Sequence, residues 1–331
     1  MIKLLIFDAG NVLYKAHLNR EIRKVVRRFL LSKGIKDFKK ERRVWNKLKK
    51  LGRVGKLNLK QCHEKWLEAL GLDKRLVKEW NRILKDFWLK HSFQFPKVNE
   101  TLKELKRRGY KLAVLSDTIE SKKEKIEKLK LFKIDYKLFD EIFTSHDIGY
   151  EKPHKKAFEK VWKFFKVKPN ETIFVGHDEE LEGAKKLGMI TISFRNPKAR
   201  ADFFCRKFED LLKIIEKIER EKIRELLGKT VKIKIDRPLG SRHPKWKWIY
   251  PVNYGYVEGI KAPDDENLDA YVLGVFKPIK EFKGKVIAII HRKDDNEDKL
   301  IVAPKGKNYT KDQIKVLVEF QERWFKSEII V

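Results

Sequence analysis

The sequence predicts two domains in series, an α/β domain built on a parallel sheet and then a small β-barrel packed by one terminal helix. Three observations support this prediction. Short apolar runs alternate with helical periodicity over the first two thirds of the chain, and strand-like runs followed by an amphipathic stretch occupy the last third. The chain has 331 residues, which is long for one hydrophobic core and ordinary for two.

The first domain shows four apolar runs of strand length. They lie at residues 2–7, 111–115, 172–175 and 190–194. Because helical periodicity separates each run from the next, we expect a parallel sheet with helices on both faces. Ligands of such sheets bind beyond the carboxyl ends of the strands. Asp8, Ser116 and Gly176 each follow one of these runs, so we expect them at one edge of the sheet.

A block without strand character lies at residues 15–95. Apolar residues recur there at spacings of three and four, among them Phe29, Trp66 and Trp80. This periodicity predicts an all-helical insertion. The tryptophans form either a binding stripe or the packed core of the insertion, and their helical spacing favours the core.

The boundary between the domains is predicted near residue 225. Residues 207–227 have the period of an amphipathic helix, which stops at Gly228. We therefore expect domains at 1–225 and 226–331. The strand-like runs of the second domain and its closing helix lie at 230–236, 247–257, 270–275 and 285–291, and at 310–326.

The formal net charge is +31, of which +25 falls in residues 1–227 and +6 in the remainder. The excess is spread through the predicted helices, and 38% charged residues with few Cys and Met resembles the composition of hyperthermophile proteins. We interpret most of this charge as solvated surface. The positive electrostatic field of such a surface also predicts weak, non-specific affinity for nucleic acid.

No apolar stretch reaches the length of a membrane-spanning helix, and Asp8 interrupts the apolar start that a signal peptide requires. A cytoplasmic protein is expected. Cys62 and Cys205 are too few for a disulfide framework and have no metal-ligand spacing. Both are expected to be reduced and buried.

Four residues of the first domain offer the parts that phosphoryl transfer to a carboxylate requires. Such a reaction needs a nucleophile, a divalent metal that neutralises charge, and a hydroxyl and a cation on the phosphoryl oxygens. The candidates are Asp8 after the first apolar run, Ser116 at the end of VLS, Lys152 in GYEKPHKKAF and Asp178 after TIFVGH. In this order the motifs resemble the haloacid dehalogenase-like hydrolase superfamily over residues 2–215.

That resemblance implies a Rossmann-like parallel sheet, with the helical insertion similar to the superfamily's helical cap. It implies that Asp8 is the nucleophile and a magnesium ligand. Ser116 and Lys152 are the implied partners of the phosphoryl oxygens. Asp178 is the implied remaining metal carboxylate.

The chain departs from the superfamily pattern in two places. Gly10 stands where its phosphatases usually carry an aspartate that acts as general acid and base, so protonation of the leaving group is unassigned. In the acidic loop, Glu180 stands where a second aspartate is usual, and His177 stands near the first. The metal carboxylate is therefore open among Asp178, Glu179 and Glu180.

Two motifs of the second domain indicate a metal-dependent diphosphate site. YPVNYGYV at 250–257 is followed by DDENLDAY at 264–271. A small anion of high charge requires several divalent ions, and clustered carboxylates with Lys, Arg and Tyr meet that need. These motifs resemble the soluble inorganic pyrophosphatases over residues 228–331, which implies an OB-type barrel.

The second resemblance implies a set of acidic metal ligands. They are Asp264, Asp269, Asp298 and Asp294, with Asp295 as the alternative to Asp294. Glu266 stands at the position of the family's general base, where an aspartate is usual.

The same resemblance implies residues that contact phosphate. They are Tyr254, Lys299 and Lys326, with Arg242 as a further candidate. Phe325 stands where the family has a phosphate-binding tyrosine.

The sequence therefore predicts a bifunctional hydrolase with Mg²⁺ as its cofactor. One half is expected to act as a phosphatase on a small phosphorylated metabolite, and the other to hydrolyse inorganic pyrophosphate to phosphate. Two alternatives stay open. Only one half is catalytic and the other is a scaffold, or the chain is a basic nucleic-acid-binding protein with vestigial hydrolase sites.

Overall fold

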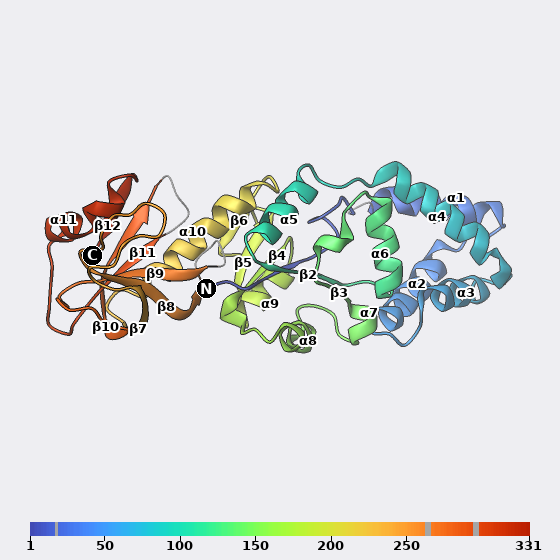
Figure 1. The fold of residues 1–331 in the computed structure, drawn as a ribbon. Helices are drawn as coiled ribbons and strands as arrows, with labels where there is room; N and C mark the ends of the chain where they lie inside the picture. The colour runs from blue at the N-terminus through green and yellow to red at the C-terminus, as the bar shows by residue number, and fades with distance from the viewer. Residues whose placement is uncertain (17–18, 262–265, 294–297) are drawn as a thin grey trace. The chain divides into compact units, whose positions relative to one another are not determined.

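The computed structural model describes residues 1–16, 19–261, 266–293 and 298–331. The chain forms two compact units, Ile2–Leu212 and Lys213–Val331, and Met1 packs with the second (Figure 1). Helix α10, Asp210–Arg224, runs through the division between them. The predicted boundary near residue 225 lies just after this helix.

The first unit is built on six parallel strands in the order β3-β2-β1-β4-β5-β6. The strands are β1 Leu4–Phe7, β2 Lys111–Ser116, β3 Glu141–Thr144, β4 Thr172–Gly176, β5 Ile190–Phe194 and β6 Phe203–Cys205. The predicted parallel sheet is confirmed, and β1, β2, β4 and β5 match the four apolar runs. The two strands that the sequence did not predict, β3 and β6, are the edges of the sheet. Edge strands are short and partly exposed, so they lack a continuous apolar run.

Helices cover the sheet and supply its core. They are α5 Val98–Arg107, α6 Lys122–Leu131, α7 Ser145–Ile148, α8 Lys155–Phe165 and α9 Glu180–Lys186. Phe158 and Trp162 of α8 pack with Ile6 and Phe174 of the central strands. Every residue of β1 is buried, because a central parallel strand has helices against both of its faces.

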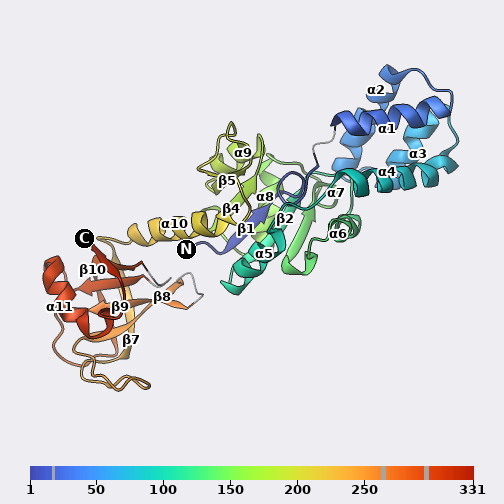
Figure 2. The same ribbon diagram turned by 90° about the horizontal axis from the view of Figure 1, so that it is seen from above.

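Four further helices lie in the chain between β1 and α5, and we call them the cap. They are α1 Asn19–Ser32, α2 Phe38–Arg53, α3 Leu59–Ala69 and α4 Val77–His91, and Figure 2 shows α1 beside α4. The cap has its own hydrophobic core, which contains Phe29, Trp66 and Trp80. The all-helical insertion and the packing of these tryptophans are confirmed.

The second unit is a closed barrel. Its elements are β7 Thr230–Arg237, β8 Asn253–Lys261, β9 Asn267–Val272, β10 Glu281–Arg292, β11 Lys299–Ala303, α11 Lys311–Glu322 and β12 Ser327–Ile330. The strand order is β11-β9-β8-β7-β10-β12, and β11 also pairs with β10, which closes five strands on themselves. Strand β7 alternates between buried and exposed residues, as a strand with one face on a barrel core must. The predicted barrel with a C-terminal helix is confirmed.

Helix α11 is held to the barrel by apolar packing and by a buried ion pair. Ile314 and Val318 pack against the tyrosines that line one end of the barrel. Arg292 donates to Glu322 at 2.7 Å, and the Tyr271 hydroxyl donates to the same carboxylate at 2.7 Å. In the described ranges, no helix combines the length and the apolar character needed to span a bilayer.

Candidate active sites

The first site lies where the carboxyl ends of β1, β2 and β4 meet. Asp8 directly follows β1, and its backbone N–H donates to Val175 of β4 at 2.9 Å. The next turn is tight, because Asn11 has a φ of 59° and its side chain accepts from the N–H of Ala16 at 2.9 Å. Ser116 is buried at the end of β2. The arrangement of parallel strands therefore places the predicted residues at one edge.

Lys152 reaches this edge from the loop before α8. Its ammonium donates to Asp8 Oδ1 at 2.8 Å and to the Leu115 carbonyl at 2.6 Å, and it lies 3.8 Å from Asp117. Burial disfavours the charged forms of Lys152 and Asp8, but the attraction between the two opposite charges is stronger than this effect. The pKa of Lys152 is raised, and that of Asp8 is lowered with help from His177. Asp8 is thus an ionised carboxylate held beside a cation.

His177 and Glu180 complete a cluster around Asp8. His177 Nδ1 lies 3.3 Å from Asp8 Oδ2 and 3.3 Å from Glu180 Oε1. The backbone N–H groups of His177 and Asp178 donate to Glu180 Oε1 at 3.0 and 3.2 Å. Burial opposes but does not cancel the effect of the carboxylates, which raises the pKa of His177 to about 9. The first turn of α9 therefore orients the Glu180 carboxylate toward Asp8.

These three residues are the group of potential metal ligands that the described part of the chain contains. One ligand atom from each of Asp8, His177 and Glu180 lies within 4.8 Å of the others. Asp178, the predicted metal carboxylate, is exposed and lies outside this group, although it lines the same cavity. Two carboxylates and one imidazole suit a divalent cation.

Asp117 was missed by the sequence prediction. It directly follows Ser116, and its carboxylate accepts from the backbone N–H of Lys152 at 3.0 Å. Burial raises its pKa, with Lys152 opposing that effect. The sequence signal was present, since Asp117 continues the VLS motif by one residue.

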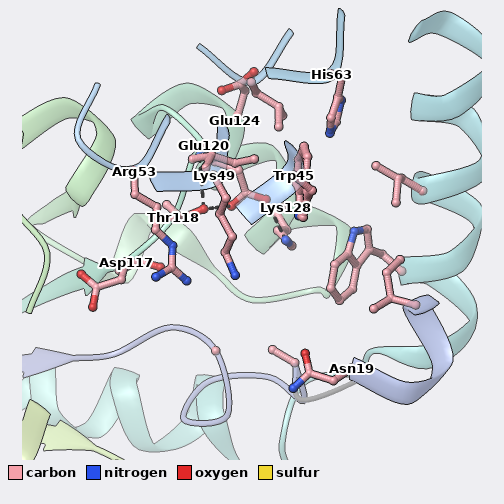
Figure 3. Close-up of a pocket in the computed structure, with 18 of the residues that line it drawn as sticks. Asn19, Trp45, Lys49, Arg53, His63, Asp117, Thr118, Glu120, Glu124 and Lys128 are labelled. Atoms are coloured by element: carbon pink, nitrogen blue, oxygen red, sulfur yellow. Dashed lines mark hydrogen bonds and ion pairs between the residues drawn. The ribbon is translucent and has the colours of Figure 1, made fainter. Parts of the chain in front are cut away.

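A cavity of about 1680 Å³ opens from the first site toward the cap. Asp8, Ser116 and Lys152 line it on the side of the sheet. The opposite wall carries aromatic and basic side chains of the cap, which Figure 3 shows in part. The sheet edge that carries Asp8, Ser116 and Lys152 thus faces a chamber formed largely by the cap.

The second site is a hydrogen-bonded triad on three barrel strands. Lys299 on β11 donates to Asp269 Oδ2 at 2.6 Å and to the Tyr254 hydroxyl at 2.8 Å. The Tyr254 hydroxyl donates to the same Asp269 carboxylate. Burial, reinforced by the charge of Asp269, raises the pKa of Tyr254 well above its ordinary value. Three of the predicted residues therefore meet, one each from β8, β9 and β11.

The motif YPVNYGYV has a structural explanation. A Cβ on Gly255 would lie 2.0 Å from the Lys234 carbonyl oxygen, so only glycine allows β8 this close to β7. The buried Asn253 side chain accepts from the N–H of Leu239 at 3.0 Å and donates to the Lys277 carbonyl at 3.0 Å. The motif thus holds together the loops around the triad.

The structure describes four other predicted residues of the second site. Asp298 is paired with His291 at 2.7 Å. Arg242, Glu266 and Lys326 are exposed. Asp264, Asp294 and Asp295 fall outside the described residues.

Asp236 at the end of β7 was not predicted. Desolvation raises the pKa of its carboxyl, Arg237 opposes this effect, and the charge of Asp269 adds to it. Asp236 therefore adds a second carboxylate close enough to Asp269 to feel its charge. The sequence shows it only as the polar end of an alternating strand.

Both halves of the chain match known families of hydrolases. Residues 22–194 match the family of haloacid dehalogenase-like hydrolases, and residues 215–328 match the family of inorganic pyrophosphatases. The fold and the sites thus define a phosphohydrolase with two domains. The chain belongs to the haloacid dehalogenase-like hydrolases and carries a C-terminal domain of the inorganic pyrophosphatase family.

Several curated proteins are similar to this chain. A glyceraldehyde 3-phosphate phosphatase of Methanopyrus kandleri is 28% identical over 69% of this chain and 96% of its own length. The protein of that name from Pyrococcus furiosus is 36% identical over 39% of this chain, which spans 55% of the relative. The pyrophosphatase PpaX of Bacillus mycoides is 31% identical over 38% of this chain and 61% of its own length.

Among solved structures, a 2-haloacid dehalogenase from Pseudomonas syringae shares the fold. The likeness covers 66% of this chain and 100% of that protein, with a TM-score of 0.53 and 18% identity. At this identity the likeness establishes the α/β fold and not the reaction.

Proposed function

We propose that the chain is a bifunctional, Mg²⁺-dependent phosphohydrolase. The first domain hydrolyses the phosphomonoester of a small metabolite, and the second hydrolyses inorganic pyrophosphate to phosphate. One observation carries the first activity: a buried, ionised Asp8 with Lys152 at 2.8 Å, and with His177 and the carboxylate of Glu180 beside it. The Tyr254–Asp269–Lys299 triad supports the second.

The residues of the first site fit a magnesium ion. Asp8 and Glu180 offer carboxylate oxygens, which hard divalent cations prefer, and Asp178 lies nearby on the same cavity. When bound, the ion supplies positive charge that lets an anionic nucleophile approach an anionic phosphate. Such an ion would be held by Asp8 and Glu180, with His177 as their hydrogen-bond partner.

The chain's own groups then divide the work of phosphoryl transfer. The Asp8 carboxylate attacks phosphorus, the ester oxygen leaves, and an aspartyl phosphate forms and is later hydrolysed by water. Lys152 and Ser116 hold the phosphoryl oxygens, because both are buried at the same sheet edge. A buried ammonium beside the phosphoryl group stabilises the charge of the transition state more strongly than a solvated one does.

In the second domain, Lys299 and Tyr254 bind phosphate oxygens, with Lys326 and Arg242 as further contacts. By the match to the inorganic pyrophosphatase family, Asp269 would hold metal together with Asp264, Asp294 and Asp298. Glu266 acts as the general base. The buried position of Lys299 supports this reading, because it places a desolvated cation at the centre of the triad.

Phosphate release tests both activities. Wild type, Asp8→Asn and Asp269→Asn are compared on inorganic pyrophosphate and on a panel of sugar phosphates, with Mg²⁺ at high temperature. Two independent sites require that monoester hydrolysis is lost only with Asp8→Asn and pyrophosphate hydrolysis only with Asp269→Asn. Loss of both activities with Asp8→Asn alone would restrict catalysis to the first domain.

The nucleic-acid alternative rests on the net charge of +31. Non-specific binding to nucleic acid weakens steeply as salt rises, because it releases counterions. Hydrolysis at a buried site does not share that dependence. Parallel salt titrations of activity and of RNA binding therefore separate the two functions.

A further inference from the structure

The cavity wall of the cap carries a positive charge that the reaction itself does not use. We propose that the first site takes a phosphomonoester whose leaving group bears a second anionic group, a carboxylate or another phosphate, which Lys49 and Arg53 bind. This proposal rests on the phosphatase activity proposed above and names its substrate class. The charges of the side chains that face the cavity support it.

Lys49 is a half-buried cation of the cavity wall that lacks an ion pair among the described residues. It lies on α2, lines the cavity and is half-buried. Within the described part of the chain it makes no hydrogen bond or ion pair. Burial lowers the pKa of Lys49, Arg53 lowers it further, and Glu151 opposes both. A half-buried ammonium without a partner is costly, and an anion in the cavity would relieve that cost.

Arg53, one turn further along α2, is only partly satisfied. Its Nη1 pairs with Glu151 at 2.6 Å, whereas its buried Nε has no partner among the described residues. The two cations therefore share one carboxylate. Figure 3 shows Lys49 and Arg53 extending into the same part of the cavity, which Asp117 and Thr118 border.

The other buried or half-buried lysines of the cavity are paired, and Lys39 and Lys85, which also line it, are exposed to water. Lys128 donates to Glu120 at 2.7 Å and lies 4.3 Å over the ring of Trp88. Lys125 pairs with the same Glu120 at 2.5 Å. The cavity arginines Arg23, Arg27 and Arg42 are likewise exposed to water. Lys49 and Arg53 are therefore distinguished as half-buried cations whose charge is not fully compensated among the described residues.

The end of α2 is fixed close to the catalytic lysine. The Gly52 carbonyl lies 2.8 Å from His146 Nδ1, and a Cβ on Gly55 would lie 2.4 Å from the His146 carbonyl oxygen. Glu151, the partner of Arg53, precedes Lys152 by one residue. A substrate whose phosphoryl group lies at Lys152 thus extends naturally toward the cationic pair.

The test uses substrates that differ in the second charge alone. Glyceraldehyde 3-phosphate and 3-phosphoglycerate differ by an aldehyde against a carboxylate, and fructose 6-phosphate and fructose 1,6-bisphosphate differ by one phosphate. We expect wild type to have the higher kcat/KM for the anionic member of at least one pair, and the pair concerned tells which anion is bound. Lys49→Met should lower kcat/KM for that substrate roughly tenfold or more, mostly through KM, and leave its neutral counterpart nearly unchanged.

Lys47→Met is the matched control, because Lys47 is an exposed residue of the same helix outside the cavity. Lys47→Met removes the same charge and should not change the ratio of kcat/KM between the two members of either substrate pair. A wild-type preference for the neutral member of both pairs overturns the proposal. So does a Lys49→Met variant that slows the two members of a pair equally.

A binding measurement separates this proposal from the proposed activity. Calorimetric titration of the Asp8→Asn variant with each phosphate ester reports affinity without turnover. If wild type hydrolyses none of the esters but the anionic member binds roughly tenfold tighter and loses this advantage in Asp8→Asn/Lys49→Met, the activity fails and the anion site stands. Equal affinities within both pairs overturn the anion site whatever the activity.

Discussion

The two sites are built from similar groups, a carboxylate against a lysine, but in different surroundings. In the first, the Asp8 side chain is 11% exposed and the Lys152 side chain 2%, so the pair is almost fully desolvated. In the second, Lys299 is 1% exposed but its partner Asp269 is 32% exposed. The difference shows that a parallel sheet gathers its site at one sheltered edge, whereas the barrel leaves the acidic half of its triad open to solvent.

The largest effect is expected when the lysine of either site is replaced. Lys152→Met leaves Asp8 buried with His177 as its remaining cationic neighbour, so it should destabilise the first domain by about 3 kcal/mol as well as abolish monoester hydrolysis. Lys299→Met should destabilise the barrel less, since water can solvate Asp269. Differential scanning calorimetry of both variants measures the contrast. Equal losses of stability would contradict it.

Glycine replacements compare the backbones of the two sites. Gly255→Ala places a Cβ 2.0 Å from the Lys234 carbonyl oxygen, and should destabilise the barrel by about 3 kcal/mol or more. Gly10→Ala meets only the Ala16 methyl group, at 3.1 Å, and should cost less than about 1 kcal/mol. Thermal melting of the two variants measures these two losses of stability. A stable Gly255→Ala protein would mean that β7 and β8 can separate without loss.

Magnesium should stabilise the first domain through a specific carboxylate. At a concentration about 100-fold above its dissociation constant, an ion that binds only the folded state adds about 2.7 kcal/mol. Glu180→Gln should remove most of this gain, and Asp178→Asn should keep it, because Glu180 lies in the cluster with Asp8 and Asp178 is exposed. Melting curves of both variants with and without Mg²⁺ show which carboxylate the stabilisation by Mg²⁺ requires. The reverse pattern would restore Asp178 as the ligand.

The smallest effect concerns acid stability of the cap. Burial lowers the pKa of His63 to about 4, with its hydrogen bond to Asn81 opposing. The unfolded chain therefore binds a proton between pH ~6.5 and ~4 that the folded chain does not, and stability falls as the pH falls through this window. His63 should account for a loss of about 2 kcal/mol at pH 5.

His63→Gln is the variant for that test, because its amide can still reach Asn81 and does not titrate. Its unfolding free energy should fall less than that of wild type between pH 7 and pH 5. Denaturant unfolding followed by tryptophan fluorescence reports on the cap, whose core contains Trp66 and Trp80. Identical losses in both proteins would show that His63 stays uncharged without cost.

Much of the fold followed from local pattern. The runs around β1, β2, β4 and β5 are mostly apolar because central strands are buried on both faces, so their burial is visible in the sequence. Strands β3 and β12 carry mixed polarity, and their strand character comes from neighbours that lie far away in the chain. Pairing of this kind leaves no periodic signal.

The sequence by itself determined that Asp8 and Ser116 share one edge of the sheet, because parallel strands bring their carboxyl ends together whatever the loops do. Only the tertiary structure shows that Glu180, and not Asp178, lies in the cluster with Asp8, since that depends on how the first turn of α9 is oriented. The tertiary structure also shows that Lys49 is both half-buried and without an ion pair among the described residues. Charge compensation is a property of groups brought together by folding, and Lys49 differs from the other lysines of the chain only in what surrounds it.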